Sequence, residues 1–122
     1  MNSTTKIDVT NDFSPVPLGR FPEDSPFNGT TFRVELLLPA LTSFSKVQVV
    51  FDGAEGYGSS FLEEAFGGLI RNEGLRESKL LSQLEFISNE DPTIIDEVLS
   101  YIHEAEISLQ NKGGVINSPK SR

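Results

Sequence analysis

A strand, a glycine-rich turn and a helix that follow one another without a break constrain this chain most. Residues 46–51 are rich in valine and alternate between two sides, which is typical of a buried central strand. The segment from Asp52 to Gly58 contains three glycines that end this strand. Apolar residues then recur at three- and four-residue steps from Phe61 to Ile70, which indicates a helix. A strand that turns into a helix is typical of α/β folds.

Further strands and helices are predicted on either side of this unit. The apolar patterns place strands at residues 6–13 and 84–87 and helices at residues 32–44 and 92–109. Asn28 or Thr30 would cap the first of these helices, and Pro39 predicts a kink or an early stop within it. Four prolines in residues 14–26 exclude a helix or a central strand there, which leaves an ordered loop or a short edge strand around Arg20-Phe21.

The order of these elements predicts the fold class. Strands that alternate with helices form a small mixed or parallel sheet with right-handed crossovers, here covered by about three helices. We therefore expect one α/β domain over residues 1–109. Residues 110–122 contain two glycines, one proline and few apolar side chains, so they are predicted to be a disordered C-terminal tail.

Composition excludes several classes of function. The 122 residues include 18 Asp and Glu, 10 Lys and Arg, one His and no Cys, which gives a net charge of -8. The absence of Cys excludes thiolate zinc sites and Cys nucleophiles, and one His leaves no His-rich metal site. The negative charge opposes binding to nucleic acid or to anionic membranes. With no apolar targeting or spanning segment, we expect a cytoplasmic protein without a cofactor.

Ligands of open α/β sheets bind where a strand turns into a helix, so residues 52–60 are the candidate site. The segment matches a phosphate-binding loop at Gly53, Gly58 and Ser60, but Ser59 stands where that motif has Lys. Four acids surround it in the sequence: Asp52, Glu55, Glu63 and Glu64. Because these charges oppose an anion, the match is weak and we do not expect a nucleotide-hydrolysing loop.

Catalysis by a serine of this segment would depend on His103. This is the only imidazole that could activate Ser59 or Ser60, and its place beside apolar helix positions is more typical of a structural His at the edge of the core. A divalent cation would have only Asp52 and Glu55 as ligands, which is a poor signal for a metal site. The sequence thus predicts no catalytic residue and no metal ligand.

Several residues of the segment and the following helix have structural explanations. Ser60 and Glu63 have the spacing of a capping box, which predicts that the helix starts at Ser60. Tyr57, flanked by glycines, is either an interface anchor or folds back onto the sheet edge. Gly67 and Gly68 each cost a helix about 1 kcal/mol relative to Ala, so we expect this helix to pack closely onto the sheet.

The run from Phe51 to Arg71 resembles the signature of the bacterial STAS-like family of unknown function. Shorter matches occur at residues 19–21, 28–33, 37–41 and 101–105. The similarity covers roughly residues 6–106. It implies a single STAS-like domain with the fold of the anti-anti-sigma (STAS) superfamily, in which a small mixed sheet with helices typically forms a non-enzymatic signalling module.

The resemblance also implies a regulatory site. In anti-anti-sigma factors the matching loop reads Asp-Ser-Ser-Gly, and a partner kinase phosphorylates a Ser there to break a protein complex. Ser59 and Ser60 match the two serines, and Ser60 is nearer the phosphorylated position. Gly58 and Phe61 stand where that pattern has Asp and Gly. The alternative is that Ser60 only caps the helix.

We therefore predict a signalling module that binds a protein partner through residues 52–60 and the start of the next helix, with Ser60 or Ser59 as a phosphosite. The binding residues would be Asp52, Gly53, Gly56, Tyr57, Gly58, Ser59 and Ser60. The resemblance makes a histidine-kinase-like ATPase a candidate partner, and it permits a monomer or a homodimer. The alternative function is a small-molecule or nucleotide-binding sensor.

Overall fold

The computed structural model describes residues 3–117, and the side chains of residues 3–112. Three of its elements are π-helical turns, labelled η. In chain order the elements are β1 (Thr4–Asp8), η1 (Val9–Phe13), α1 (Gly29–Phe32), η2 (Arg33–Leu37), α2 (Leu38–Ser43), β2 (Lys46–Val50), α3 (Ser59–Leu62), η3 (Glu63–Gly67), α4 (Gly68–Arg71), α5 (Glu77–Gln83), β3 (Leu84–Ile87) and α6 (Thr93–Asn117). The predicted α/β class is confirmed.

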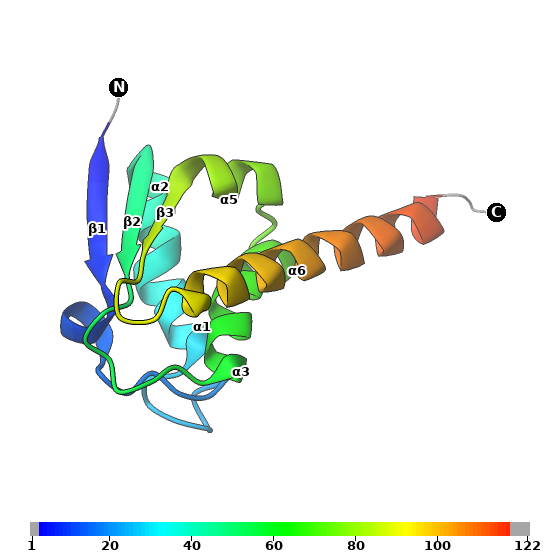
Figure 1. Ribbon diagram of the computed structural model, residues 1–122. Coiled ribbons are helices and arrows are strands. Elements are labelled where there is room, and N and C mark those ends of the chain that lie inside the picture. The colour runs from blue at the N-terminus through cyan, green and yellow to red at the C-terminus, as the bar shows by residue number, and fades with distance from the viewer. Residues whose placement is uncertain (1–2, 118–122) are drawn as a thin grey trace.

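The sheet is parallel and has the order β1-β2-β3, with β2 in the centre as predicted. Both crossovers step in the same direction, so right-handed connections put their helices on the same face. That face carries the buried strand side chains Ile7, Val47, Val49 and Leu84. The other face is more polar and carries Lys6, Lys46, Gln48 and Glu85. Figure 1 shows the helices gathered on one side of the strands.

The first helical segment runs from Gly29 to Ser43 and contains a π-helical turn. Asn28 caps it, as predicted, by accepting a hydrogen bond from the Thr31 N–H at 2.9 Å. The early stop considered at Pro39 does not occur, because the helix continues to Ser43. Instead the helix widens over η2, where the Leu38 N–H donates to the Arg33 carbonyl. Pro39 has no backbone N–H to donate, and this wider turn accommodates that loss.

The strand predicted for residues 6–13 ends at Asp8, so its second half was wrong. The carboxylates of Asp8 and Asp12 hold η1 instead, by accepting bonds from the backbone N–H groups of Asn11 and Asp8. The edge strand considered at Arg20-Phe21 is also absent from the described residues, because both backbone N–H groups donate to the Asp24 carboxylate in a turn.

The structure contains one helix that was not predicted and one that is longer than predicted. The polar stretch at residues 72–78 leads into α5, which the apolar pattern did not indicate. Helix α6 continues to Asn117, within the segment predicted to be disordered, and Figure 1 shows its end projecting from the body. Residues 118–122 of that prediction lie outside the described residues. No helix of residues 3–117 has the length and apolar character needed to cross a membrane.

Two loops meet at the carboxyl end of the sheet, at the bottom of Figure 1. One is the glycine-rich loop of residues 52–58, and the other is the proline-rich loop of residues 14–28. They are joined by backbone bonds from Glu55 N–H to Pro15 at 2.8 Å and from Gly58 N–H to Pro17 at 3.4 Å. Tyr57 of the glycine-rich loop packs against the core rings of Phe51 and Phe61.

Candidate functional site

The glycine-rich loop is fixed by hydrogen bonds to three neighbouring segments. Thr10 of η1 donates to the Asp52 carbonyl at 2.9 Å, and the Glu90 carboxylate accepts the Gly53 N–H at 2.8 Å. Gly53 has a φ of +93°, and a Cβ there would lie 3.1 Å from the Thr10 hydroxyl, so the position favours glycine. With the N–H groups of Gly53, Glu55 and Gly58 bonded within the protein, the loop does not form the amide cradle of a phosphate-binding loop.

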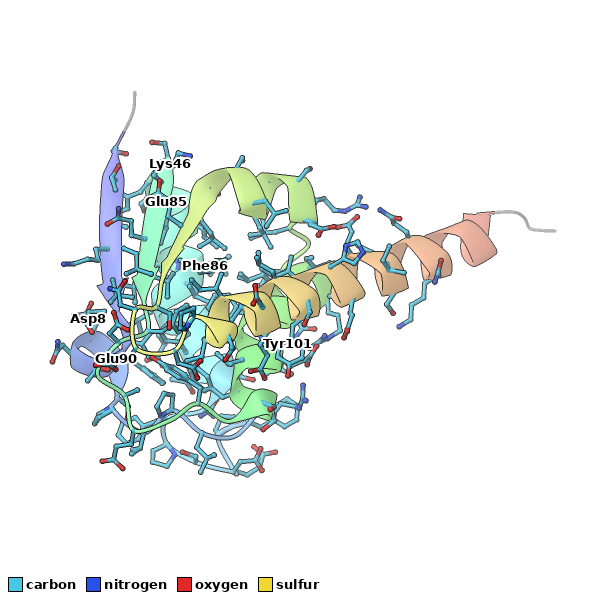
Figure 2. All side chains as sticks on the ribbon, viewed as in Figure 1. Asp8, Lys46, Glu85, Phe86, Glu90 and Tyr101 are labelled. Carbon is cyan, nitrogen blue, oxygen red and sulfur yellow. The ribbon has the colours of Figure 1, made fainter. Side chains whose placement is uncertain are left out.

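Asp52 ties this loop to the connection between β3 and α6. Its carboxylate accepts bonds from the N–H groups of Asn89 and Glu90 at 2.8 and 2.9 Å and from the Asn89 amide at 3.1 Å. The acid therefore has a structural role that the sequence did not indicate. Figure 2 shows Glu90 at the same end of the sheet as Asp8.

Of the two alternatives for Tyr57, the structure shows the one in which the side chain folds back. Its hydroxyl donates to the Phe51 carbonyl at 2.8 Å, and its ring packs edge-on against the Phe51 ring at 5.3 Å. Burial raises the pKa of the phenol above its ordinary value, and the nearby charges of Asp8, Asp52 and Glu90 raise it further. Tyr57 therefore attaches the loop to Phe51, and part of its side chain stays exposed.

The capping box predicted at Ser60 was wrong. The helix begins at Ser59 with Gly58 at the N-cap, and no side chain caps it. Ser60 is therefore the second residue of the helix, and Glu63 turns away to pair with Arg20 and Arg71. Ser59 is the more exposed of the two serines.

Ser59 has a neighbour on another element. Its side chain lies near Tyr101 on α6, a residue that Figure 2 labels. The Tyr101 hydroxyl donates to the Glu97 carboxylate at 2.6 Å, and this bond raises the pKa of the phenol. A group added to Ser59 would therefore approach Tyr101 and the Glu97 carboxylate bonded to it.

His103 contacts α5 and not the serines of the loop. Its Nδ1 is 3.1 Å from the Glu77 carboxylate at the start of α5, and the side chain is 60% exposed. This is the surface position expected of a structural His. Within residues 3–117, no three Asp, Glu, His or Cys side chains are grouped as a metal site requires.

Two concave surfaces flank the loop. The first, the acidic cavity, has a volume of about 220 Å³ and is lined by the carboxylate residues Asp52, Glu55, Glu90, Asp91 and Glu97. The second, the apolar groove, has a volume of about 380 Å³ and is lined by Val16, Pro17 and Leu18 of the proline-rich loop. Glu55, Gly56 and Tyr57 line both. The loop is thus the ridge between an acidic and an apolar concavity.

A second group of charged residues has a role that the sequence did not indicate. We call it the arginine cluster; it contains Arg20, Arg33, Arg71, Glu63, Glu64 and Glu73. Arg33 and Glu64 are each 3% exposed, and an Arg33 Nη lies 2.9 Å from the Glu64 carboxylate. The signal available in the sequence was the place of Glu64 on the apolar side of its helix, between Phe61 and Ala65.

The arginine cluster also explains the paired glycines of the helix. A Cβ on Gly68 would overlap the Arg33 guanidinium, and one on Gly67 would lie 2.6 Å from the Glu63 carboxylate. The close approach expected at these positions is therefore made by ion pairs and not by the sheet: the buried pair of Arg33 and Glu64 at Gly68, and the partly exposed pair of Glu63 and Arg71 at Gly67. A similar constraint applies at Gly29, where a Cβ would lie 2.6 Å from the Phe61 carbonyl.

A family model described as a STAS-like domain of unknown function matches residues 28–93. The chain belongs to this family. The matched part of the STAS-like domain includes the glycine-rich loop and five of the six residues of the arginine cluster. No curated protein and no solved structure matches the chain. The family description assigns no function, so the function must be argued from the site.

Proposed function

We propose that this STAS-like domain is a non-enzymatic signalling module that binds a protein partner through residues 52–60 and the first turn of α3. The observation that carries the proposal is the open space around Gly56 in the glycine-rich loop: a Cβ on Gly56 would meet no atom within 4 Å. Beside it, Val16 and Leu18 in the apolar groove are 43% and 58% exposed. Exposed apolar side chains with a polar border are typical of protein contact surfaces.

The regulatory part of the proposal is phosphorylation of Ser59, with Ser60 as the alternative. Ser59 is exposed and is the first residue of a helix without a side-chain cap, so a phosphate there would meet free backbone N–H groups. Glu63 and Glu64 oppose it less than their sequence positions suggest, because both pair with arginines. The Glu97 carboxylate, which is bonded to Tyr101 and has no paired cation among the described residues, opposes it. The added charge would stand at the edge of the partner surface and change its affinity.

A nucleotide sensor is less well supported than a protein partner. The acidic cavity, at about 220 Å³, is smaller than the roughly 300–1,000 Å³ of common ligand sites. Its carboxylates repel phosphate groups, and the loop N–H groups that would bind them are used within the protein.

The test is affinity capture from the source organism with quantitative mass spectrometry, using the wild type, Gly56→Trp and Asn111→Trp. Tryptophan at Gly56 has room to extend over both concavities, so it should remove the partner without changing the free energy of unfolding. Asn111 is exposed on the projecting part of α6, and its substitution is the matched control. The same proteins captured by all three baits would overturn the proposal.

The phosphosite is tested separately on the protein purified from its native cells. Intact mass and peptide sequencing should find phosphate on Ser59 or Ser60. Ser59→Glu should weaken capture of the partner, whereas Ser59→Ala should retain it. Equal capture by these two variants would exclude the switch and leave the partner surface itself standing.

A further inference from the structure

The carboxylates of the acidic cavity have no basic partner among the described residues. The four arginines Arg20, Arg33, Arg71 and Arg76 each pair with glutamates elsewhere: Glu63, Glu64, Glu73 and Glu106. None of the ion pairs within residues 3–117 involves a carboxylate of the cavity. The cavity is therefore an uncompensated negative region in a protein whose two buried acids among the described residues, Glu64 and Glu106, are paired with arginines.

Three of these carboxylates are held in position by hydrogen bonds within the protein. Asp52 accepts backbone bonds from Asn89 and Glu90, Glu90 accepts one from Gly53, and Glu97 accepts the Tyr101 hydroxyl. An ionised carboxylate has about four acceptor sites, so each can accept further bonds. The raised pKa of Tyr57, to which Asp52 and Glu90 contribute after burial, is consistent with a negative potential here. Charges positioned in advance attract a cationic group at little cost in ordering.

The walls of the cavity also suit a long side chain. Phe51, Ala54 and Ile94 contribute apolar surface beneath the carboxylates. Lys and Arg combine an apolar stem with a charged end, and the Arg guanidinium can bond both oxygens of a carboxylate at once. The apolar groove lies on the other side of Glu55, Gly56 and Tyr57, which border both concavities. A cationic group and an apolar group on neighbouring residues would therefore fit the two concavities together.

We propose that the partner docks with a segment in which a Lys or Arg enters the acidic cavity and an adjacent apolar side chain fills the groove beside Leu18. The inference rests on the proposed function and adds the chemistry of the partner. The charged contact gives specificity and speeds association, and the apolar contact provides buried area. Both contacts depend on the loop that the STAS-like fold holds at the carboxyl end of its sheet.

The test begins with selection of binding peptides from a random library on the full chain. We expect enrichment of sequences with Arg or Lys beside a large apolar residue. The best peptide is then compared with its citrulline version, which keeps the shape of Arg without its charge. Loss of the charge should weaken binding about tenfold, and Glu55→Lys should do the same. Glu35→Lys, an exposed acid outside both concavities, is the matched control and should leave binding unchanged.

Several results would overturn the inference. Peptides without a basic residue, equal affinity of the Arg and citrulline peptides, or no enrichment at all would each do so. NMR titration with calcium or spermine alone is a further check, because saturable shifts around Gly53 and Ile94 would assign the cavity to small cations. Concentration-dependent dimerisation weakened by Glu55→Lys would assign it to a second copy of the chain. If Gly56→Trp still abolishes capture in any of these cases, the proposed function stands and only the partner chemistry fails.

Discussion

Two groups of acids, those of the arginine cluster and those of the acidic cavity, differ in what surrounds them. In the arginine cluster, Glu63 and Glu64 are matched by three arginines, and Glu64 is almost fully buried. In the acidic cavity, Asp52 and Glu55 face a concave surface without a cation among the described residues. The comparison shows that acids close together in the sequence can have different surroundings: one group joins helices through ion pairs, and the other lines a concave surface without a paired cation.

The largest effect is expected from removing a cation of the arginine cluster. Arg33→Met leaves the Glu64 carboxylate buried with fewer partners, since the Arg33 guanidinium also donates to the Glu64 carbonyl at 2.6 Å. Breaking one side of a buried ion pair costs about 3–5 kcal/mol. Urea denaturation followed by circular dichroism should show a loss of this size in the free energy of unfolding.

The matched control for this variant is the double change Arg33→Met with Glu64→Leu. Because apolar replacement of a whole buried pair is often close to neutral, the double variant should recover most of the lost stability. A loss of less than about 1 kcal/mol in Arg33→Met alone would show that the cluster is solvated like a surface pair, and the contrast with the cavity would disappear.

The next effect concerns Gly68, where an added Cβ would overlap the Arg33 guanidinium. Alanine normally stabilises a helix by about 1 kcal/mol relative to glycine. Arg33 is bonded to Glu64 and Glu73 and has little room to move, so Gly68→Ala should instead cost about 1–3 kcal/mol. In the Arg33→Met background the same change should become neutral or stabilising. A cost that is equal in both backgrounds would point to another obstacle.

Arginine-paired carboxylates should make stability depend on pH. Burial opposes ionisation of Glu63, but hydrogen bonds from Arg71 and Arg20 hold its pKa below the ordinary value. Arg76, with the Glu77 N–H, lowers the pKa of Glu106 to about 2. A carboxyl group with a lower pKa in the folded state stabilises the protein above its unfolded pKa, here 4.5, and this is lost as the pH falls toward 2.

The urea midpoint should therefore decrease between about pH 5 and pH 2, where carboxylates of this kind become protonated. Arg76→Gln should flatten part of this decrease, because it removes the main cause of the shift at Glu106. Lys112→Gln, at an exposed position, is the control for the loss of a positive charge. Identical pH profiles of Arg76→Gln and the wild type would contradict the assignment.

The sequence predicted the central strand and the helix after the glycine-rich loop well, because local patterns encode both. The apolar runs at β2 and β3 and the Asn28 cap are local signals, and they were read correctly. The role of Glu64 depends on Arg33, which is 31 residues away in the chain. A pairing at that distance has no local pattern, so Glu63 and Glu64 were assigned to the loop that they follow in the sequence.

The smallest stability effect is expected in the acidic cavity, and it separates the two groups of acids most directly. Glu55 is exposed, and its side chain makes no hydrogen bond or ion pair within the described residues. Glu55→Lys should therefore change the free energy of unfolding by no more than about 0.5 kcal/mol, like the control Glu35→Lys. Relief of repulsion from Asp52 and Glu90 favours a small gain, measured by urea denaturation at low salt. A decrease of more than about 1 kcal/mol in the free energy of unfolding would show that Glu55 is a structural acid like Glu64. Glu55 would then not be available to pair with a cation of the partner.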